Sequence, residues 1–287
     1  MAVGGTKVNP SHFHVNQLPI YAIVLPVAAF MGAPILYIFN NAFKPFDELF
    51  AYPPRFFVQN PTISNFSRLF QRTAESVVPL TRYIFNTFLI TAVVIAATLL
   101  IGSLAAFSLS KIKFRGRQIV LETNNLALMF VGTAVTIPSY LIVTSIGISN
   151  TYWAHILPLL ASPVGMFLVK QFIDQVPDEL VEAAEIEGAN VLVVYRRIIL
   201  PLIRPAMATM GVLAFQTVWN NTTTSSLYVT DESLQTLAFY FQTLPSGTVQ
   251  GAGVSAASSL IMFIPNLILF IFMQSKVMNT MARSGLK

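Results

Sequence analysis

The sequence predicts an all-α integral membrane protein with six transmembrane helices, both termini in the cytoplasm and one further short cytoplasmic helix. Three observations support this fold class. The 287-residue chain is 54% hydrophobic and only 10% charged, whereas a soluble protein carries about 25% charged residues. Six apolar runs are long enough to cross a bilayer, which takes about 20 helical residues. Lys and Arg are concentrated in some of the loops between these runs.

The apolar runs are expected to be helices, because backbone groups in lipid must form hydrogen bonds within their own segment. They are too continuous to be barrel strands, which alternate in polarity over about ten residues. We therefore expect a single transmembrane domain, residues 1–287, with an N-terminal tail at residues 1–17. The six spans are expected at residues 18–40, 82–110, 120–147, 151–172, 198–220 and 251–275.

Proline interrupts several of these runs. Pro138 lies in the third and Pro163 in the fourth. Proline removes a backbone hydrogen bond and kinks a helix. Two interpretations are open for these kinks: ordinary packing of a helix bundle, or the shaping of a path between helices.

The orientation follows from the positive residues in the loops, because Lys and Arg mark cytoplasmic loops. The loop between the second and third runs is rich in them and should be cytoplasmic, as should both termini and the loop after the fourth run. Residues 221–250 carry no Lys or Arg and should lie outside, while residues 40–82 are mixed and argue weakly the other way. The positive residues of the first loop are Lys111, Lys113, Arg115 and Arg117.

Several classes of function are excluded. The chain has no cysteine, which rules out disulfides, cysteine metal sites and a cysteine nucleophile. His12, His14 and His155 lack metal-ligand spacing. A glycine-rich phosphate loop with a lysine is absent, so we expect no enzyme activity in this chain. The net charge of +5 lies beside apolar runs, which favours contact with membrane lipid and not with nucleic acid.

An acidic segment stands out between the fourth and fifth runs. Six of the twelve acidic residues fall between Asp174 and Glu187. Pro177 suits the first turn of a helix, and an acidic pair after it complements the helix dipole. Gly188 suits the position just after the helix, where the chain turns. So short a helix is marginal alone, so the bundle or a partner must hold it.

The spacing in this segment resembles a known motif. Glu182-Ala183-Ala184 is followed after three residues by Gly188, after nine more by Ile198, and after one more by Leu200-Pro201. This pattern resembles the EAA loop of ABC importer permeases, here residues 174–201. Further stretches resemble the carbohydrate (maltose-type) subfamily, and the tail is similar to that of its MalG-like second permease, although shorter than in many relatives. These stretches include Phe50–Arg55, Asn60–Asn65, Gly147–Trp153 and Trp219-Asn220.

The resemblance implies a permease subunit of an ATP-driven, binding-protein-dependent importer of oligosaccharides or sugar derivatives. It implies a bacterial inner-membrane location and three kinds of partner: a second homologous permease, two ATP-binding subunits and an extracytoplasmic solute-binding protein. ATP and Mg would bind the ATPase partner, so no cofactor is expected on this chain. ATPase closure would reach the transport pathway through a cytoplasmic coupling helix.

The resemblance also assigns roles to residues. Glu182 would pair with a basic ATPase residue, and Gly188 would make the turn. The tail would reach between the ATPase subunits, and residues 221–250 would probe the cleft of the binding protein. The remaining coupling residues would pack against the ATPase or anchor the loop: Ala183, Ala184, Glu185, Leu200 and Pro201. The tail residues are Ser284, Gly285, Leu286 and Lys287.

Polar and aromatic residues in or near the spans are weaker candidates for a transport pathway. Polar residues inside a membrane are often functional, but hydrogen bonds between helices are an equally ordinary role. The pathway candidates are Thr133, Thr136, Trp219, Asn220 and Asn221, with Asn86 and Ser139 weighed beside them. We expect His155 to be an interfacial residue. We also expect Tyr83, Tyr152, Trp153 and Trp219 to form interfacial belts.

Two alternatives remain open. The same kind of permease could import another solute, such as a polyamine or glycerol phosphate. An ion-coupled secondary carrier would need acidic residues inside the membrane. Glu122 lies near the start of the third span and no Asp or Glu lies in the middle of a span, which disfavours that class.

Overall fold

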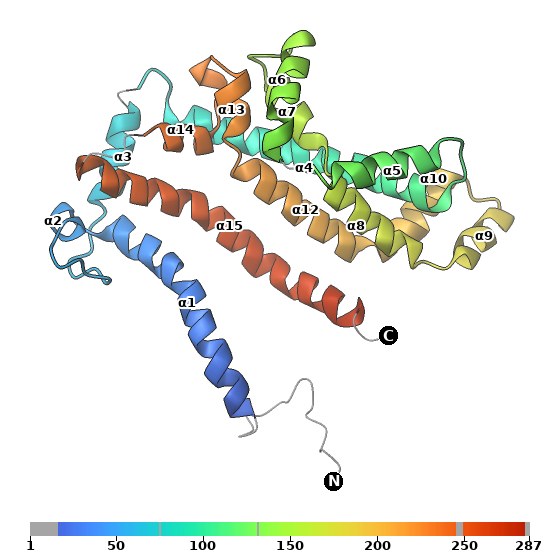
Figure 1. Cartoon of the computed structure of the whole chain (residues 1–287), viewed down its shortest axis with the longest axis horizontal. Helices are drawn as coiled ribbons and strands as arrows, with labels where there is room; N and C mark the ends of the chain where they lie inside the picture. Colours follow the sequence, from blue (N-terminus) through green and yellow to red (C-terminus); the bar gives the residue numbers. More distant parts are fainter. Residues whose placement is uncertain (1–16, 75, 131, 245–248, 285–287) are drawn as a thin grey trace. The chain divides into compact units, whose positions relative to one another are not determined.

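The computed structural model describes residues 17–74, 76–130, 132–244 and 249–284, and this part of the chain is helical, without a strand. Figure 1 shows the helices in chain order. The chain divides into two compact units. One comprises residues up to Leu69 and the segment that ends at Leu260. The other comprises Phe70–Pro245 and the residues from Ile261 onward.

The first unit contains α1 (Leu18–Phe43), a helix without a charged residue. Most of its side chains are exposed, and Ala42 is its one buried residue. Exposed fractions reach 82% at Phe30 and 70% at Ile23. A helix that presents apolar side chains all round suits contact with lipid.

A folded cap follows α1 in the same unit. It consists of α2 (Phe46–Leu49), a loop, and the start of α3 (Ser64–Ala74). Glu48 accepts hydrogen bonds from the backbone N–H groups of Gln59 (2.9 Å) and Asn60 (2.8 Å). These bonds fasten the loop to α2.

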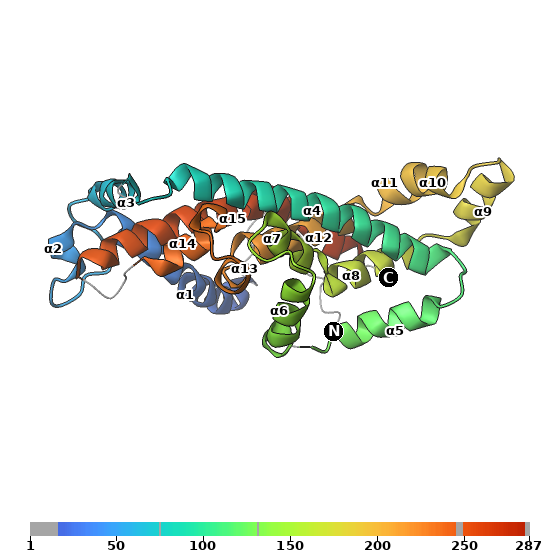
Figure 2. The same ribbon diagram turned by 90° about the horizontal axis from the view of Figure 1, so that it is seen from above.

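The second unit is built around α4 (Leu80–Lys111), a helix of 32 residues. Three helices pack along it and bury one side of it. Figure 2 shows them beside α4. They are α7 (Tyr152–Leu160), α8 (Pro163–Asp174) and α12 (Arg204–Trp219).

In the described part of the chain, three helices are long and apolar enough to cross a membrane, and up to six spans result if each bent pair counts as one. The three long ones are α1, α4 and residues 251–273 of α15 (Val249–Ser284). The all-α membrane fold is thereby confirmed, while the cytoplasmic placement of the termini stays a prediction. The bent pairs are α5 (Arg117–Ala127) with Gly132–Ser145, α7 with α8, and Val191–Leu202 with α12.

The expected third, fourth and fifth spans are therefore not straight helices. The last two pairs bend by 43° and 80°. Pro163 begins α8 at the first bend, and Pro205 stands in the first turn of α12 at the second. Proline disfavours a helical conformation of the residue before it. Hydropathy sums over a window and carries no information about direction, which is why these breaks are absent from the apolar pattern.

The segment after α12 folds back onto the second unit. It contains α13 (Thr223–Tyr228), the 3₁₀ helix η4 (Glu232–Leu234) and α14 (Leu237–Thr243). These pack against α4, α7 and α6 (Thr136–Ser145), the helix that follows η2 (Gly132–Val135). Asp231 precedes η4, and its side chain accepts a hydrogen bond from Ser233 N at 2.8 Å.

Candidate functional site

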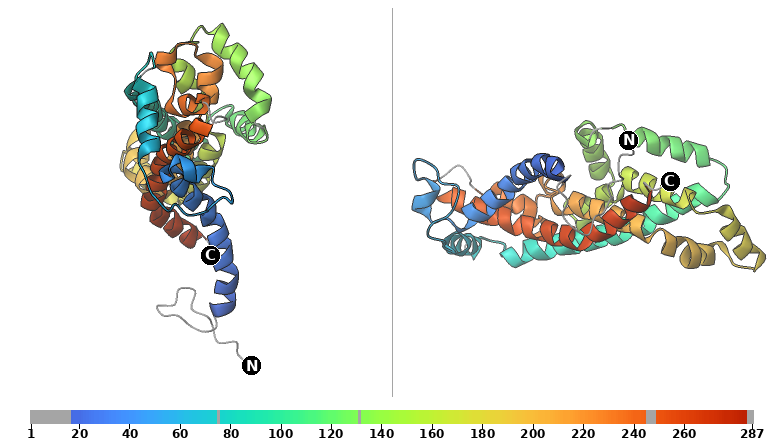
Figure 3. Two further views of the ribbon diagram at one scale, coloured as in Figure 1. Left: turned by 90° about the vertical axis from the view of Figure 1, so that its left-hand side faces the viewer. Right: turned by 90° about the horizontal axis from the view of Figure 1, so that it is seen from below.

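The acidic segment forms a helix, α9 (Asp178–Ile186), near the Lys111 end of α4. Figures 2 and 3 show α9 and α10 at that end of the second unit. Pro177 precedes the helix, and Asp178 and Glu179 occupy its first turn. Negative side chains there lie next to unpaired backbone N–H groups, which stabilises the helix.

The other end of α9 closes with two backbone bonds across Gly188. Gly188 N donates to Glu185 O at 3.0 Å, and Ala189 N donates to Ala184 O at 2.9 Å. This pair of bonds defines a Schellman motif. Gly188 has a φ of +83°, the left-handed conformation that glycine adopts without steric cost.

A second helical arm leads from this turn to α12 (Arg204–Trp219). Asn190 begins it by accepting a bond from Val193 N at 2.9 Å. The arm runs through α10 (Val191–Val194), the π-helix η3 (Tyr195–Ile199) and α11 (Leu200–Leu202). Leu200 N donates to Tyr195 O, five residues back. The segment from Asp178 to Leu202 is thus a helix–turn–helix.

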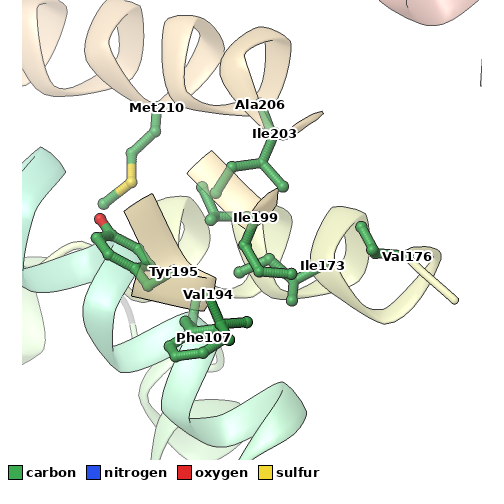
Figure 4. Close-up of a cluster of buried hydrophobic side chains, with 11 residues drawn as sticks. Phe107, Ile173, Val176, Val194, Tyr195, Ile199, Ile203, Ala206 and Met210 are labelled. Carbon is green, nitrogen blue, oxygen red and sulfur yellow. The ribbon is translucent and has the colours of Figure 1, made fainter. Parts of the chain in front are cut away.

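A buried apolar cluster holds the two arms on the second unit. Figure 4 shows side chains from α4, α8, the second arm and α12 pointing toward one another. The Tyr195 hydroxyl forms a hydrogen bond with Ser103 Oγ at 2.6 Å. The Tyr195 ring packs against the Phe107 ring, with the centroids 5.5 Å apart. The cluster joins α4, α8 and the second arm through Phe107, Ile173, Val176, Val194, Tyr195 and Ile199.

The inner side of α9 rests on this cluster through Val181 and Ala184. Ala183 is exposed instead. Both alanines are among the residues expected to pack against the ATPase or anchor the loop, and they lie on different sides of α9. Adjacent helical residues point about 100° apart, so one alanine faces the core while the other faces away.

The outward surface of α9 combines acidic and apolar side chains. Glu182 and Glu185 are exposed. Ile186 is 87% exposed and Leu180 46% exposed. Leu192 on the second arm adds another exposed apolar side chain at 58%. We name this surface, formed by Leu180, Glu182, Ala183, Glu185, Ile186 and Leu192, the α9 face.

The two other expected anchors lie in the second arm. Leu200 is partly buried and packs against the apolar cluster. Pro201 is exposed. Pro201 supplies no backbone N–H, which limits the regular hydrogen bonding of this turn.

Lys111 contributes to the position of α9, a role that its place in a basic loop did not indicate. Its Nζ lies 2.5 Å from Asp178 Oδ1 and donates to Val176 O at 2.6 Å. The hydrogen bond from Lys111 and its positive charge hold the pKa of Asp178 below its usual value of 3.8. Two sequence signals were available: a lysine in the last turn of an apolar run, and an aspartate at the start of the acidic helix.

Two aromatic residues expected in interfacial belts are buried. Trp219 is 2% exposed. Its ring stacks on that of Phe215 with the centroids 5.3 Å apart, and the Trp219 Nε1–H donates to Met262 O at 3.1 Å. Tyr83 is 2% exposed and stacks on Tyr240 at 4.3 Å. The belt assignment is wrong for both, because other helices of the unit cover them. Trp153 is 56% exposed, and Tyr152 is partly buried.

His155 was expected at a membrane interface, and this is also wrong. It is 0% exposed, with ring nitrogens 2.8 Å from Thr224 Oγ1 and 3.1 Å from Leu234 O. Asn86 is equally buried and donates to Ser233 O and to Gln235 O. Both side chains form hydrogen bonds that attach residues 224–235 to α4 and α7.

The pathway candidates are not gathered in one place by these contacts. Asn221, just before α13, accepts hydrogen bonds from the N–H and the hydroxyl of Thr224. Asn220 is exposed and bonds to Gln216 O. Thr133 is exposed and Thr136 bonds to Gly132 O, while Ser139 is partly buried. Of the tail residues, Ser284 ends α15, and Gly285, Leu286 and Lys287 lie outside the described residues.

Known proteins resemble this chain along most of its length. The family described as binding-protein-dependent transport system inner membrane component matches residues 18–275. The probable ABC transporter permease protein YurM of Bacillus subtilis is 27% identical, with 96% of this chain and 90% of that protein covered. The diacetylchitobiose uptake system permease protein DasC of Streptomyces coelicolor is 26% identical, covering 93% and 97%.

A solved structure shares the fold. It is a crystal structure of a bacterial ABC transporter involved in the import of the acidic polysaccharide alginate. The TM-score is 0.78 at 19% identity, with 93% of this chain and 99% of that chain covered. The chain therefore belongs to the family of binding-protein-dependent transport system inner membrane components, the membrane-embedded permease subunits of ABC transporters.

Proposed function

We propose that this permease imports an oligosaccharide or a sugar derivative and that α9 is its coupling helix. The exposed α9 face carries this proposal, because a short helix held on the buried cluster presents acidic and apolar side chains outward. A helix so placed can be pushed by a partner without losing its attachment to the spans.

The α9 face suits a partner with a basic, partly apolar cleft. Glu182 would pair with a Lys or Arg of the ATP-binding subunit, while Ala183 and Ile186 would fill the apolar part of the contact. A charge pair that loses its water on docking gives specificity as well as affinity. Gly188 would make the turn between the two arms, and Leu200 and Pro201 would anchor the second arm.

The assembly that we propose has one second, homologous permease and two ATP-binding subunits. ATP and Mg would bind those subunits. This chain would bind no cofactor, and the loop with α9 and both termini would face the cytoplasm. Closure of the ATPase pair would move α9 and open the pathway alternately to the two sides.

The substrate class rests on the relatives. One imports diacetylchitobiose, according to its name, and the transporter with the same fold imports alginate. Uptake of a polyamine or of glycerol phosphate is the alternative within the same mechanism.

Copurification tests the assembly directly. The tagged chain, coexpressed with a candidate second permease and ATP-binding subunit, should retain both in detergent. A chain that transports as a homodimer without an ATPase would refute the proposal. Thermal-shift screening of the candidate binding protein against oligosaccharides, polyamines and glycerol phosphate then identifies the solute. Stabilisation by an oligosaccharide alone is the expected result.

A further inference from the structure

The short linker between α8 and α9 is held at both ends by the last two residues of α4. Ser110 Oγ donates to Asp174 Oδ1 at 2.5 Å, and Asp174 is the last residue of α8. Lys111 Nζ bonds to Val176 O and to the carboxylate of Asp178, the first residue of α9. The linker therefore has contacts to α4 on either side of Pro177.

Lys111 is built into this contact. Its side chain is 7% exposed, whereas that of Asp178 is 74% exposed. Withdrawing an ammonium group from water is costly unless charge and hydrogen bonds compensate it. Asp178 and Val176 O supply that compensation. The end of α4 adds to it, because a cation is favourable at a helix C-terminus.

The far end of α4 is attached in a comparable way to the segment that follows α13. Arg82 Nε donates to Ser233 O at 3.0 Å, and Leu237 N donates to Thr87 Oγ1 at 2.8 Å. With 32 residues, α4 is about 48 Å long. One continuous helix thus connects α9 with residues 233–237.

We propose that Lys111 positions α9 on α4 through Asp178, so that a force applied to α9 is delivered to α4 and through it to residues 233–237. This inference rests on the proposed role of α9 as the coupling helix. Lys111 is a positioning residue here, because its nearly buried side chain acts through Asp178 and does not itself belong to the α9 face.

Spin-label distances test the attachment. The chain has no cysteine, so Ile101→Cys on α4 and Glu187→Cys after α9 would be the only labelled sites of this subunit. The complex with its ATP-binding subunits is measured without nucleotide and with ATP and vanadate. With Lys111 and Asp178 unchanged, the two labels should give one narrow distance population in both states. Lys111→Met and Asp178→Ala should each lose that single population.

A double-mutant cycle separates positioning from simple loss of structure. If the two residues act through each other, the Lys111→Met/Asp178→Ala double variant should be no worse than either single variant. The readout is the nucleotide-driven change in mobility of a single spin label at Ser233→Cys, since residue 233 is attached to α4 and its distance to a label on α4 would stay constant. We expect the fraction of molecules that respond to fall about five-fold, a usual size for coupling between sites.

Lys170→Met is the matched control. Lys170 also forms an ion pair, with Asp174 at 2.7 Å, but the pair lies within α8 and does not reach α9. The control should keep the narrow population. Additive effects in the cycle, or an unchanged distance in Asp178→Ala, whose exposed side chain tolerates truncation, would overturn the inference alone. A wild-type chain that binds no ATP-binding subunit would overturn both the inference and the proposed function.

Discussion

Gly188 illustrates how one backbone angle shapes the docking segment. Its φ of +83° is rare for residues with a side chain, yet open space surrounds the position where a Cβ would lie. The cost of a substitution there comes from the backbone conformation and not from a steric clash. The turn between α9 and α10 therefore depends on the residue type at position 188.

Gly188→Val should destabilise this turn by about 1–2 kcal/mol, because a β-branched residue disfavours the left-handed conformation. Gly188→Asn should cost less, since asparagine visits that conformation. Copurification of the ATP-binding subunit should fall for the valine variant and be largely kept for the asparagine variant. Equal retention by both variants would contradict the role of Gly188 in the turn.

Glu48 shows a second residue-scale effect, in the cap of the first unit. The bond from Gln59 N, and those from Asn60, hold the pKa of the Glu48 carboxyl below its usual value of 4.5. A carboxyl with a lowered pKa stabilises the folded state above the usual pKa. That stabilisation is lost as the pH falls through the lowered value.

The cap loop should therefore loosen in acid, below pH 4.5. Hydrogen-exchange protection of the Gln59 and Asn60 amides should decrease as Glu48 becomes protonated. In Glu48→Gln the same protection should be lower at neutral pH and nearly independent of pH. A wild-type protection that stays constant below the usual pKa would disprove this account.

At the scale of whole elements, glycines decide how closely helices approach. A Cβ on Gly253 of α15 would lie 2.2 Å from Asn65 Oδ1. Asn65 is 0% exposed and donates to Ala42 O and Lys44 O, so its amide has little freedom to move. On α4, a Cβ on Gly102 would meet the flexible end of Met210 at 2.1 Å.

Gly253→Ala should thus destabilise the first unit by about 1–3 kcal/mol, the usual cost of overpacking. Gly102→Ala should cost less, because the Met210 side chain can change rotamer. Gly211→Ala is the control, since its nearest neighbour would be Leu99 at an ordinary 3.8 Å. The melting temperature in detergent should be lowest for Gly253→Ala, higher for Gly102→Ala and highest for Gly211→Ala. A Gly253 variant as stable as the Gly211 variant would contradict this packing.

At the scale of the whole molecule, the α9 face is the surface on which the ATP-binding subunit would dock and through which its closure would move this chain. Glu182 belongs to that face and is exposed, so changing it should leave the membrane-embedded helices intact. Its charge matters only when a partner docks. The effect of a charge reversal is therefore expected in the assembly and not in the isolated subunit.

Glu182→Lys should insert into the membrane normally but lose ATP-coupled uptake by more than about ten-fold, because like charges across an interface cost several kcal/mol. Uptake in vesicles, with the solute found by thermal-shift screening, is the measurement. Glu122→Lys reverses another exposed charge, on α5, and should retain uptake. Normal uptake by the Glu182 variant would remove α9 from the coupling role.

The sequence alone was sufficient for the fold class and for the family. Apolar runs such as residues 83–109 and the spacing from Glu182 to Pro201 are local properties of the chain. Lipid imposes the same requirement on every spanning segment, namely internal hydrogen bonding, so length and polarity are enough to predict helices. The turn at Gly188 was equally local, because it depends on one backbone conformation.

Only the tertiary structure decided which side chains are covered. It divided Ala183 from Ala184, buried Trp219 and His155, and placed Lys111 against Asp178. Each of these outcomes depends on a neighbouring helix far away in the chain, as with Lys111 and Asp178 at the ends of different helices. Residue type and spacing carry no information about which helix will lie alongside, because packing is settled by the shapes of all the elements together.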